Sequence, residues 1–498
     1  MNVNPITRLD YPDPDVIRVE DTYYMVSTTM HFMPGCEILQ SFDLVHWEHA
    51  TYVYETLDHT DAQQLKSGQN IYGQGMWAAS LRYHEGRFYI CFVANDTRKT
   101  YLYTSEKIDG PWKKQLIEGF YHDGSLLFDE DGRNYIVYGN DEIWITELNE
   151  DLTAPKKDGL HRLLVSDHKN PELGYEGSHI QKINGYYYIF LVHSLRDRWM
   201  RTEACFYSDS LEGEFTGGDV LCDDRGYCGQ GVAQGGIVDT PDGKWYAMLF
   251  QDSGAVGRIP ILLLVTWKDH FPVFGQNGHV PEEIEVHSTR PGYIYQPLVG
   301  SDDFCNGLLP RWQFNHDPDP RYYHLDALQG TYTITTREVC TELTQAVNTL
   351  TQRMSYPSCA AEVTVDASAL KEGDVAGLCA LQGCYAAVGI TKHHGKYEVL
   401  MLDKKEDGIL DMTEGTVVES HQMDFRLEAD FCNMKDEARC YYRVNKGDWL
   451  PIGTVHKLYF KLDHFTGCRF GLFCYAAEET GGSACFRDFK YYDVDEIS

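Results

Sequence analysis

The chain has 498 residues, of which 43% are hydrophobic and 13% aromatic, so it is long enough for two or three domains and too apolar to be disordered throughout. Its formal net charge of −32 argues against nucleic acid and anionic membranes as partners, because both bind basic surfaces. Every uninterrupted apolar run is shorter than the roughly 20 residues that cross a bilayer, which predicts no transmembrane span.

The first residues and the cysteines indicate a cytoplasmic location. Residues 1–15 contain no apolar core and no small-residue cleavage site, so we expect no signal peptide. The fifteen cysteines form no zinc-type C-x-x-C pair. Several, such as Cys91 and Cys205, lie in apolar strand-like runs, where a reduced cysteine behaves as a small hydrophobic residue. We therefore expect a reduced, cytoplasmic protein.

From about residue 4 to about residue 278 the sequence consists of short β-type runs separated by Gly, Asp and Asn turns. One pattern, a tight turn followed by aromatic residues, occurs five times and ends each time on a tyrosine. Repeats of about 45 to 65 residues are typical of a β-propeller, in which equivalent positions of successive blades converge on a central axis. The five tyrosines are Tyr24, Tyr89, Tyr135, Tyr188 and Tyr246.

A residue at a fixed distance before each of these tyrosines is expected to lie on the axis. We count back twelve residues in four repeats and eleven in the first, whose turn we take to be one residue shorter. Three carboxylates sent to one place repel one another and lose hydration, a cost that makes sense if the site performs acid–base chemistry. The five positions are Asp13, Trp77, Asp123, Glu176 and Gln234.

The second half of the chain has a different pattern. Residues 288–300 read as a connection, and from Ser301 onwards the runs alternate apolar and polar residues, as half-buried antiparallel strands do. An interval of roughly 200 residues fits one β-sandwich. The sequence thus predicts an all-β chain with a propeller over residues 1–290 and a sandwich over residues 301–498.

Three acidic residues are the candidates for chemistry. Asp13 lies between two prolines at a strand mouth, although an isolated P-D-P is more often a plain turn. Glu176 is expected to have a pKa raised by like charge and partial burial, which would suit a general acid; the alternative is a solvated turn residue. Asp123 could keep that acid protonated and oriented, or could be an ordinary Asp-Gly turn. The shared repeat position favours the functional interpretation of all three.

Further residues could bind substrate. Trp77 offers a flat face on which a sugar ring can stack, and its repeat position favours this over a core tryptophan. Phe32 could line the same pocket, although core packing is the more common role for such a residue. Arg258 lies in an apolar run and could face Asp13, or could sit on an edge strand.

Together these residues resemble glycoside hydrolase family 43, the β-xylosidases and α-L-arabinofuranosidases. The matching motifs are Y-P-D-P around Asp13, H-D-G-S around Asp123, Y-E-G-S-H around Glu176 and G-R at Arg258. Sandwich-like motifs at 348–353 and 377–382 extend the likeness to the group with a C-terminal domain. The resemblance implies a five-bladed propeller, a concanavalin-like jelly roll, and Asp13, Glu176 and Asp123 as general base, general acid and pKa modulator.

The resemblance also implies single displacement with inversion, with base and acid roughly 6.5–9.5 Å apart. Arg258 would contact substrate together with Trp77, Phe32 and Gln234. Gln234 stands where many members carry an axial histidine, sometimes linked to a central calcium. We expect no required cofactor; a structural Ca²⁺ stays open but has no supporting motif. An exo mode is expected, with the loop 463–467 closing the pocket.

Two alternatives stay open at this point. The first is a carbohydrate-binding propeller without catalysis, and the second is a family-43 enzyme that acts on a different glycan. The expected partner is a small oligosaccharide from plant cell walls, with neither nucleic acid nor membrane. The sequence leaves open the choice between xylose and arabinose, and the oligomeric state.

Overall fold

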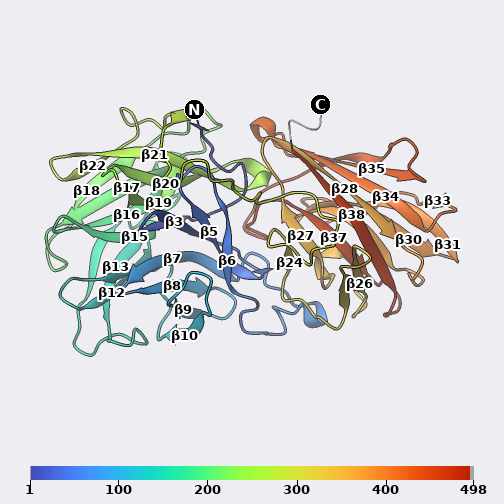
Figure 1. The fold of residues 1–498 in the computed structure, drawn as a ribbon, viewed down its shortest axis with the longest axis horizontal. Coiled ribbons are helices and arrows are strands. Elements are labelled where there is room, and N and C mark those ends of the chain that lie inside the picture. Colours follow the sequence, from blue (N-terminus) through green and yellow to red (C-terminus); the bar gives the residue numbers. More distant parts are fainter. Residues whose placement is uncertain (1, 494–498) are drawn as a thin grey trace.

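A computed structural model describes residues 2–493, and within that range the chain is all-β, as predicted. Figure 1 shows two units side by side, a propeller coloured blue to green and a sandwich coloured yellow to red. The helical segments of the described chain are four single turns of 3-10 helix. These are η1 (Lys66–Gly68), η2 (Gly254–Val256), η3 (Leu343–Gln345) and η4 (Cys432–Met434).

The propeller has five blades, each a four-stranded antiparallel sheet. Blade 1 contains β2 (Asp15–Val19), β3 (Thr22–Ser27), β5 (Gly35–Ser41) and β6 (Glu48–Tyr54). Blade 2 contains β7 (Met76–His84), β8 (Arg87–Ala94), β9 (Lys99–Ser105) and β10 (Lys113–Ile117). Blade 3 contains β11 (Ser125–Phe128), β12 (Asn134–Asn140), β13 (Glu142–Leu148) and β14 (His161–Ser166). Blade 4 contains β15 (Glu176–Ile183), β16 (Tyr186–Ser194), β17 (Arg201–Ser208) and β18 (Thr216–Leu221). Blade 5 contains β19 (Val232–Asp239), β20 (Trp245–Asp252), β21 (Arg258–Lys268) and β22 (Phe271–Phe274).

The two ends of the propeller meet in a two-stranded sheet of β1 (Asn2–Val3) and β23 (Glu283–Ile284). Asn4 supports this closure, because its side-chain amide donates to the carbonyl of Leu262 at 2.8 Å and its oxygen accepts from the same residue's N–H at 3.0 Å. The N-terminus is thereby held against blade 5. This contact closes the ring of blades without a shared blade.

The inner hairpins differ in turn length, and the assumed register has to be corrected. In blades 1, 2 and 4 two residues separate the paired strand ends, whereas the turns of blades 3 and 5 contain five residues. We expected the turn of the first repeat to be one residue shorter than the others; this was wrong, because it has the same length as the turn of the second repeat. The difference moves the equivalent positions in blades 1, 3 and 5 by one residue.

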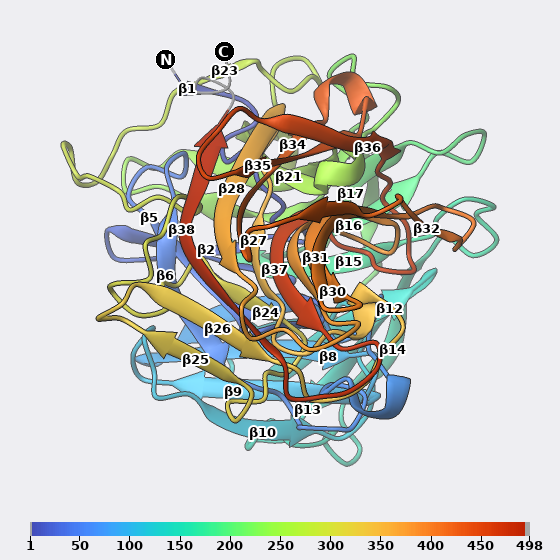
Figure 2. The same cartoon turned by 90° about the vertical axis from the view of Figure 1, so that its right-hand side faces the viewer.

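The sandwich packs two sheets over one continuous apolar core. Figure 2 views the molecule with the strands of the sandwich, such as β28, β37 and β38, in front of the propeller. One sheet contains β24 (Gln313–Asn315), β27 (Leu350–Arg353), β29 (Val375–Leu381), β30 (Tyr385–His393), β31 (Lys396–Lys404), β32 (Leu410–Met412), β33 (Thr416–Val418) and β37 (Arg469–Tyr475). The other contains β25 (Tyr323–Asp326), β26 (Thr331–Thr335), β28 (Ser358–Asp366), β34 (Gln422–Asp430), β35 (Glu437–Val444), β36 (Leu450–Lys457) and β38 (Ser483–Asp493).

One propeller segment completes a sheet of the sandwich. β4 (Phe32–Met33) leaves blade 1 and pairs antiparallel with β24, which places it at the edge of the first sandwich sheet. A buried ion pair lies close by, between Arg353 Nη1 and Glu37 Oε2 at 2.8 Å. Arg353 also donates to the backbone oxygen of Asp10 at 2.8 Å. Backbone pairing and buried charge thus tie the two units together.

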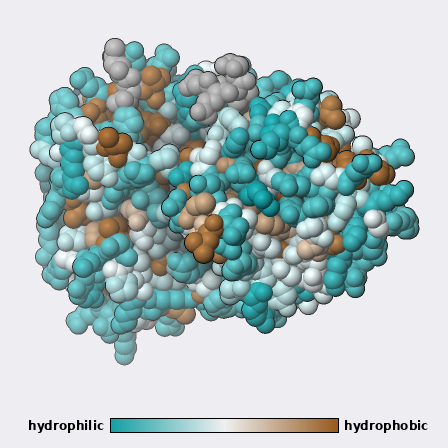
Figure 3. All heavy atoms as spheres, turned by 45° about the vertical axis from the view of Figure 1, so that its right-hand side comes forward, coloured by the Kyte–Doolittle hydropathy of each residue, from teal (hydrophilic) through white to brown (hydrophobic). Residues whose placement is uncertain are grey.

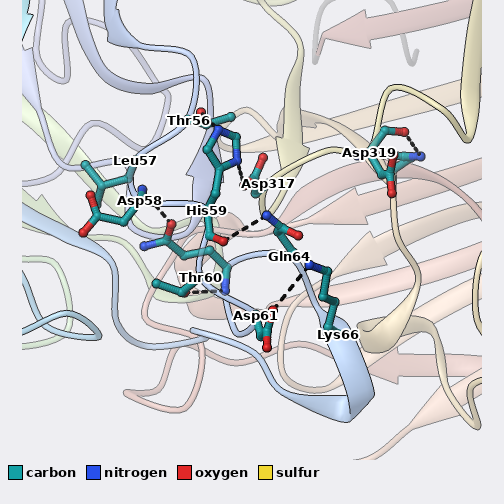
Figure 4. Close-up of polar contacts among 12 residues, drawn as sticks. Thr56, Leu57, Asp58, His59, Thr60, Asp61, Gln64, Lys66, Asp317 and Asp319 are labelled. Atoms are coloured by element: carbon teal, nitrogen blue, oxygen red, sulfur yellow. Dashed lines mark hydrogen bonds and ion pairs between the residues drawn. The ribbon is translucent and has the colours of Figure 1, made fainter.

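A long loop between blades 1 and 2, residues 55–75, docks on the sandwich. Figure 4 shows His59 pointing from this loop to Asp317, with 2.6 Å between Nδ1 and Oδ2. The N–H of Asp317 donates to the carbonyl of Gln63 at 2.9 Å. Further along the loop, the hydroxyl of Tyr72 donates to the carbonyl of Thr344 at 2.6 Å. This loop therefore carries a large part of the interface.

The connecting segment 285–300 runs back along blade 1 rather than hanging free. Its Tyr293 packs edge-on against Phe42 with 4.5 Å between ring centroids, and Arg290 binds Asp21 at 2.8 Å. Figure 3 shows a mainly hydrophilic face, as the acidic composition leads one to expect. All fifteen cysteines lie within the described residues, and each is a free thiol. In the described part of the chain no helix has the length and hydrophobicity that a bilayer crossing requires.

Candidate active site

A left-handed backbone position recurs at the mouth of every inner strand. Blades 2, 4 and 5 each show a register shift there, because an extra residue bulges out of the ladder. The bulge turns the neighbouring side chains toward the axis. The five residues with positive φ are Asp13 (52°), Ala78 (24°), Asp123 (47°), Gly177 (65°) and Gln234 (63°).

With the correct register, the five residues that we predicted to be equivalent occupy two adjacent positions of the blade repeat. Trp77 and Glu176 lie one residue before the left-handed position, whereas Asp13, Asp123 and Gln234 occupy it. The blade-3 equivalent of Trp77 and Glu176 is therefore His122, a residue that our counting missed. The sequence signal was present, since His122 immediately precedes Asp123, but the five-residue turn of blade 3 concealed it.

These positions open into a cavity of about 630 Å³, a size that suits a small ligand. All of the predicted axial residues line it, and so does Arg258. The sandwich supplies the remaining wall through Met434 and the loop 460–467, which includes the segment that we expected to close the pocket. The sandwich residues are Met434, Phe460, Lys461, Leu462 and Phe465.

Asp13 is held by two donors on opposite oxygens. Thr28 Oγ1 donates to Oδ2 at 2.7 Å, and Arg258 Nη1 donates to Oδ1 at 3.0 Å. The carboxyl group is only 7% exposed, so these bonds fix its orientation at the cavity floor. Arg258 faces Asp13 as predicted, and its backbone N–H is anchored by Asp10 at 2.7 Å.

Glu176, Asp123 and His122 form a compact group on the neighbouring blades. The Nε2 atom of His122 lies 3.5 Å from Glu176 Oε2 and 3.6 Å from Asp123 Oδ2. Asn140 donates to Glu176 Oε2 at 2.8 Å, and the N–H of Gly177 donates to Asp123 Oδ2 at 3.0 Å. The backbone following Glu176 thus holds Asp123, so the two carboxyl groups are oriented together.

The pKa values of Glu176, Asp123 and His122 differ from our expectation of a raised pKa for Glu176. Burial alone would raise the pKa of Glu176, but its contact with His122 and the charges of two cavity arginines hold that pKa below the usual glutamate range. Burial and the neighbouring carboxylates raise the pKa of Asp123 to about 6, against the effect of His122. The carboxylates of Asp123, Glu176 and Asp13 overcome burial and raise the pKa of His122 to about 9. The prediction of a raised pKa for Glu176 is therefore wrong, because we overlooked the cation beside it.

A second pair of charged residues lines the cavity and was also missed. Arg201 Nε donates to Asp252 Oδ2 at 2.9 Å, and Asp252 Oδ1 lies 3.5 Å from Arg258 Nε. Burial would raise the pKa of Asp252, but the two arginines hold it below its usual value. Arg201 begins β17 of blade 4 and Asp252 ends β20 of blade 5. The two strand ends meet because the blades converge toward the axis.

Aromatic rings form the apolar side of the cavity. Trp77 lies beside Phe465 of the sandwich with 5.3 Å between ring centroids, and Arg258 lies over the Phe465 ring at 4.2 Å. Phe32, by contrast, is 1% exposed and packs under Arg469, whose guanidinium carbon is 3.4 Å from the ring centroid. The prediction that Phe32 lines the pocket is wrong, because β4 turns it into the interface between the two units.

Asp15, at the start of β2, is buried on the axis below the cavity. Arg82 Nη1 donates to its Oδ2 at 2.7 Å, and His179 Nδ1 lies 3.1 Å from Oδ1. Burial would raise the pKa of Asp15, but these partners lower it to about 2. The axis is thus filled by side chains that neutralise one another.

One group of side chains has ligand atoms close enough for a cation. The atoms of His122, Asp123 and Glu176 all lie within 4.8 Å of one another. A metal ion requires a neutral imidazole, whereas the pKa of His122 is raised to about 9. The proton of His122 therefore competes with any metal ion, and we do not assign these residues as metal ligands.

Comparisons with known proteins agree with this arrangement. The model of Glycosyl hydrolases family 43 matches residues 3–272, and that of the Beta xylosidase C-terminal Concanavalin A-like domain matches residues 301–492. A Beta-xylosidase of Formosa agariphila is 26% identical over 99% of this chain and 89% of its own length.

Two solved structures are similar over nearly the whole chain. The Bifunctional GH43-CE of Bacteroides eggerthii has a TM-score of 0.92 and 42% identity over 99% of this chain; the chain spans 64% of that protein's length. A GH43 glycoside hydrolase engineered to display both endo-xylanase and exo-arabinofuranosidase activity has a TM-score of 0.86 and 27% identity, with 99% of both chains covered.

Proposed function

Since the chain belongs to glycosyl hydrolase family 43 and is a glycosidase, we propose that it removes terminal pentose residues, β-D-xylose or α-L-arabinofuranose, from plant cell-wall oligosaccharides. The observation that carries this proposal is the meeting of Asp13, Asp123 and Glu176 in one cavity that also holds Trp77. A binding-only propeller has no need of three carboxylates whose mutual repulsion must be offset.

The proposed reaction is a single displacement with inversion at the anomeric carbon. Asp13 removes a proton from a water molecule as that water attacks the anomeric carbon. On the other side of the sugar, Glu176 gives a proton to the leaving oxygen while the glycosidic bond breaks. Asp123 orients Glu176 through the N–H of Gly177, to which it is bound at 3.0 Å. Arg258 keeps Asp13 in place through the hydrogen bond from its Nη1.

The shape of the cavity supports an exo mode. The loop 460–467 of the sandwich covers one side, and Phe465 closes against Trp77 and Arg258. A long polysaccharide running across the propeller face would collide with this loop. A terminal sugar can instead enter from its free end, with Trp77 and Phe465 as apolar surfaces for its ring.

The two candidate sugars are both pentoses with similar hydroxyl groups. The similar proteins named above include a Beta-xylosidase and an enzyme with exo-arabinofuranosidase activity, so either sugar fits the family. A family-43 activity on another glycan remains the second candidate. The substrate assay below separates these cases.

The experiment compares nitrophenyl β-D-xyloside and nitrophenyl α-L-arabinofuranoside as substrates of the wild type, Asp13→Asn and Glu176→Gln. We expect one or both to be hydrolysed, and each substitution to lower kcat by roughly 10²- to 10⁴-fold, the usual contribution of a general acid or base. Proton NMR of the first product should show the anomer opposite to that of the substrate.

Asp21→Asn is the control, because Asp21 is an exposed carboxylate in a blade turn that pairs with Arg290. Circular dichroism verifies that all variants are folded. Full activity in Asp13→Asn would refute the assigned base, and retention of the substrate anomer would refute inversion. No hydrolysis of either substrate by the wild type would direct the search to another glycan.

A further inference from the structure

One wall of the cavity rises along blade 4 from Glu176 to the open face of the propeller. The strands β15, β16 and β17 lie side by side in this blade (Figure 1). Across their ladders Glu176 is level with Glu203, and Arg201 lies two residues, or about 6.8 Å, further toward the open face. Trp199, which is 42% exposed, lies two residues before Arg201, and both side chains line the cavity. Arg201 and Trp199 therefore stand above Glu176, on the side from which substrate enters.

The guanidinium of Arg201 is held in place through its Nε atom and two aromatic rings. Its Nε–H donates to Asp252 Oδ2 at 2.9 Å, and its central carbon lies 5.1 Å from the ring centroid of Trp199 and 5.3 Å from that of Phe250. Arg201 is only 7% exposed, yet within the described chain its terminal nitrogens donate no hydrogen bond to protein. Buried N–H groups are normally hydrogen-bonded, because their lost hydration is otherwise uncompensated. The terminal nitrogens of Arg201 are therefore donors for a ligand in the cavity.

The other long cations of the cavity use their terminal nitrogens within the protein. Arg258 Nη1 donates to Asp13 at 3.0 Å, and Lys461 Nζ pairs with Glu406. Both of these contacts hold a protein carboxylate rather than offer a free donor. Arg201 differs from Arg258 and Lys461 because its two terminal nitrogens face the cavity with their N–H groups unshared.

The charges around Arg201 favour a neutral ligand. Asp252 already balances its charge, and a further carboxylate would be repelled by Asp13, Asp123 and Glu176 in the same cavity. The parallel N–H groups of a guanidinium match two neighbouring oxygen atoms, such as adjacent hydroxyl groups of a sugar. Beside them the indole of Trp199 offers an apolar surface for the C–H face of the same ring.

The cavity has room for more than the sugar that reacts. Its volume of about 630 Å³ lies in the range of about 300–1,000 Å³ that holds drug-sized ligands, which are larger than one pentose. In the proposed reaction Asp13 and Glu176 lie on either side of the bond that breaks, and Trp77 receives the terminal ring. The next sugar must then extend from Glu176 toward the open face, past Arg201.

We propose that Arg201 and Trp199 recognise the sugar on the leaving side of the glycosidic bond. The terminal N–H groups of Arg201 donate to two neighbouring hydroxyl oxygens of this neutral sugar, and its ring packs on Trp199. The inference rests on the proposed function, because the place of the leaving sugar follows from Glu176 as the general acid. It adds a preference for hydroxyl groups that a nitrophenyl leaving group cannot satisfy.

The first test compares a disaccharide with the nitrophenyl pentoside of the same terminal sugar in the wild type and Arg201→Lys. The disaccharide is xylobiose or arabinobiose, matched to the better nitrophenyl substrate. Lysine keeps the positive charge beside Asp252 and Glu176 but lacks the two parallel N–H groups. We expect kcat/KM to fall about 10-fold on the disaccharide, the usual cost of a lost hydrogen bond to a charged group, and only a few-fold on the nitrophenyl pentoside.

Arg198→Lys is the matched control, because Arg198 lies on the same loop and pairs with Asp197 at 3.0 Å but is not among the described residues that line the cavity. We expect both of its kcat/KM values to equal those of the wild type. Trp199→Ala tests the same wall at an exposed residue, whose removal spares the core, and should raise KM of the disaccharide several-fold. Equal losses on both substrates in Arg201→Lys, or no loss on either, would overturn the inference and leave the proposed hydrolysis standing.

The second test measures binding and does not depend on hydrolysis. Isothermal titration calorimetry compares Asp13→Asn with the double variant Asp13→Asn/Arg201→Lys, using xylobiose, arabinobiose and the two free pentoses. We expect Arg201→Lys to raise Kd of a disaccharide about 10-fold and to leave that of its free pentose unchanged, because a single sugar does not reach Arg201. No change for either disaccharide would overturn the inference. A raised Kd without any hydrolysis by the wild type would refute only the function.

A disaccharide whose second sugar is a uronic acid tests the charge of the ligand. We expect it to bind Asp13→Asn more weakly than the neutral disaccharide does, because its carboxylate approaches Glu176. Tighter binding that weakens with added salt would overturn the assignment of Arg201 to a neutral sugar.

Discussion

At the scale of single residues, the cavity is a set of paired charges from different blades. Arg258 of blade 5 shows this well: it donates to Asp13 at 3.0 Å, and its guanidinium lies 4.2 Å from the ring centroid of Phe465 and 5.0 Å from that of Phe250. The planar guanidinium suits this place because it can bond at its edge and stack on both faces. A lysine ammonium can do only the first.

We therefore expect Arg258→Lys to fold but to lose activity. Loss of the stacked geometry weakens a charged hydrogen bond to Asp13, which is worth about 1.5–3 kcal/mol, or roughly 10- to 100-fold in rate. Measurement of kcat/KM on the better of the two nitrophenyl pentosides checks this. Arg290→Lys, at an exposed ion pair with Asp21, provides the comparison and should retain full activity. Wild-type activity in Arg258→Lys would contradict a role for its planar shape.

The residue-scale predictions depended on a repeat register that was right to within one position. Asp13, Asp123 and Glu176 do meet, because a shift of one residue around a bulge keeps side chains at the same end of the axis. His122 was missed for the same reason. Turn lengths of two and five residues cannot be told apart by aligning aromatic residues, since both return the chain to the same strand face.

At the scale of elements, the loop 460–467 is fastened to the propeller beside the catalytic residues. Asp10 accepts from the N–H of Gly467 at 2.8 Å with one oxygen and from the N–H of Arg258 at 2.7 Å with the other. A side chain at position 467 would collide with this anchor and with the neighbouring backbone, because its Cβ would lie 2.7 Å from the Cβ of Asp10 and 2.2 Å from the carbonyl oxygen of Val256. Gly467 therefore permits the close approach that places Phe465 in the cavity.

We expect Gly467→Ala to push the loop outward and to weaken substrate binding. The added methyl group forces either the loop or the backbone near Val256 to move, and Phe465 moves with it. KM for a nitrophenyl pentoside should rise several-fold more than kcat falls. Gly218→Ala is the control, since no atom lies within 4 Å of the Cβ that it adds. An unchanged KM in Gly467→Ala would show that the loop does not close on substrate.

The strands and domains were easier to predict from the sequence than the contacts between segments that are far apart in it. The alternation of turns and aromatic residues was sufficient to predict five blades, and the change at Ser301 marked the sandwich. The docking of the loop 463–467 was expected from the resemblance, but its anchor Asp10 was not. A contact between residues more than 450 positions apart in the sequence leaves no local pattern, and neither does the pairing of β4 with β24.

At the scale of the whole molecule, three histidines from both units share the buried interface. The ring of His31 lies 4.8 Å from that of His316 and 4.9 Å from that of His464. Burial lowers all three pKa values, that of His464 to about 3. Nearby positive charge adds to this effect, from the other rings at His31 and His316 and from Arg469 at His31 and His464. The interface is therefore assembled with neutral imidazoles.

This predicts a loss of stability in acid. The folded pKa values lie below the ordinary value of 6.5, so the unfolded chain binds more protons, and stability declines as the pH falls below about 6.5. Each neutral histidine contributes up to about 1.4 kcal/mol per pH unit. Urea denaturation of the wild type from about pH 7 to about pH 5 should show this slope.

His316→Asn should have a shallower slope than the wild type, because one of the three groups no longer titrates. Its free energy of unfolding at neutral pH can be lower, since the imidazole accepts from the N–H of Ile71 at 3.0 Å, so the comparison is between slopes. His394→Asn, on the exposed turn after β30, should keep the wild-type slope. Equal slopes in His316→Asn and the wild type would exclude the interface histidines as the cause.

The position of Phe465 also determines when the cavity becomes enclosed during synthesis. A ribosome completes the propeller when little more than half of the chain has been made, and domains generally fold in that order. Asp13, Asp123 and Glu176 can then assemble on their blades, but the wall formed by residues 460–467 is still unsynthesised. A nascent or truncated chain thus carries the acidic residues without an enclosed cavity. The pocket is enclosed only once the sandwich has been made and folded.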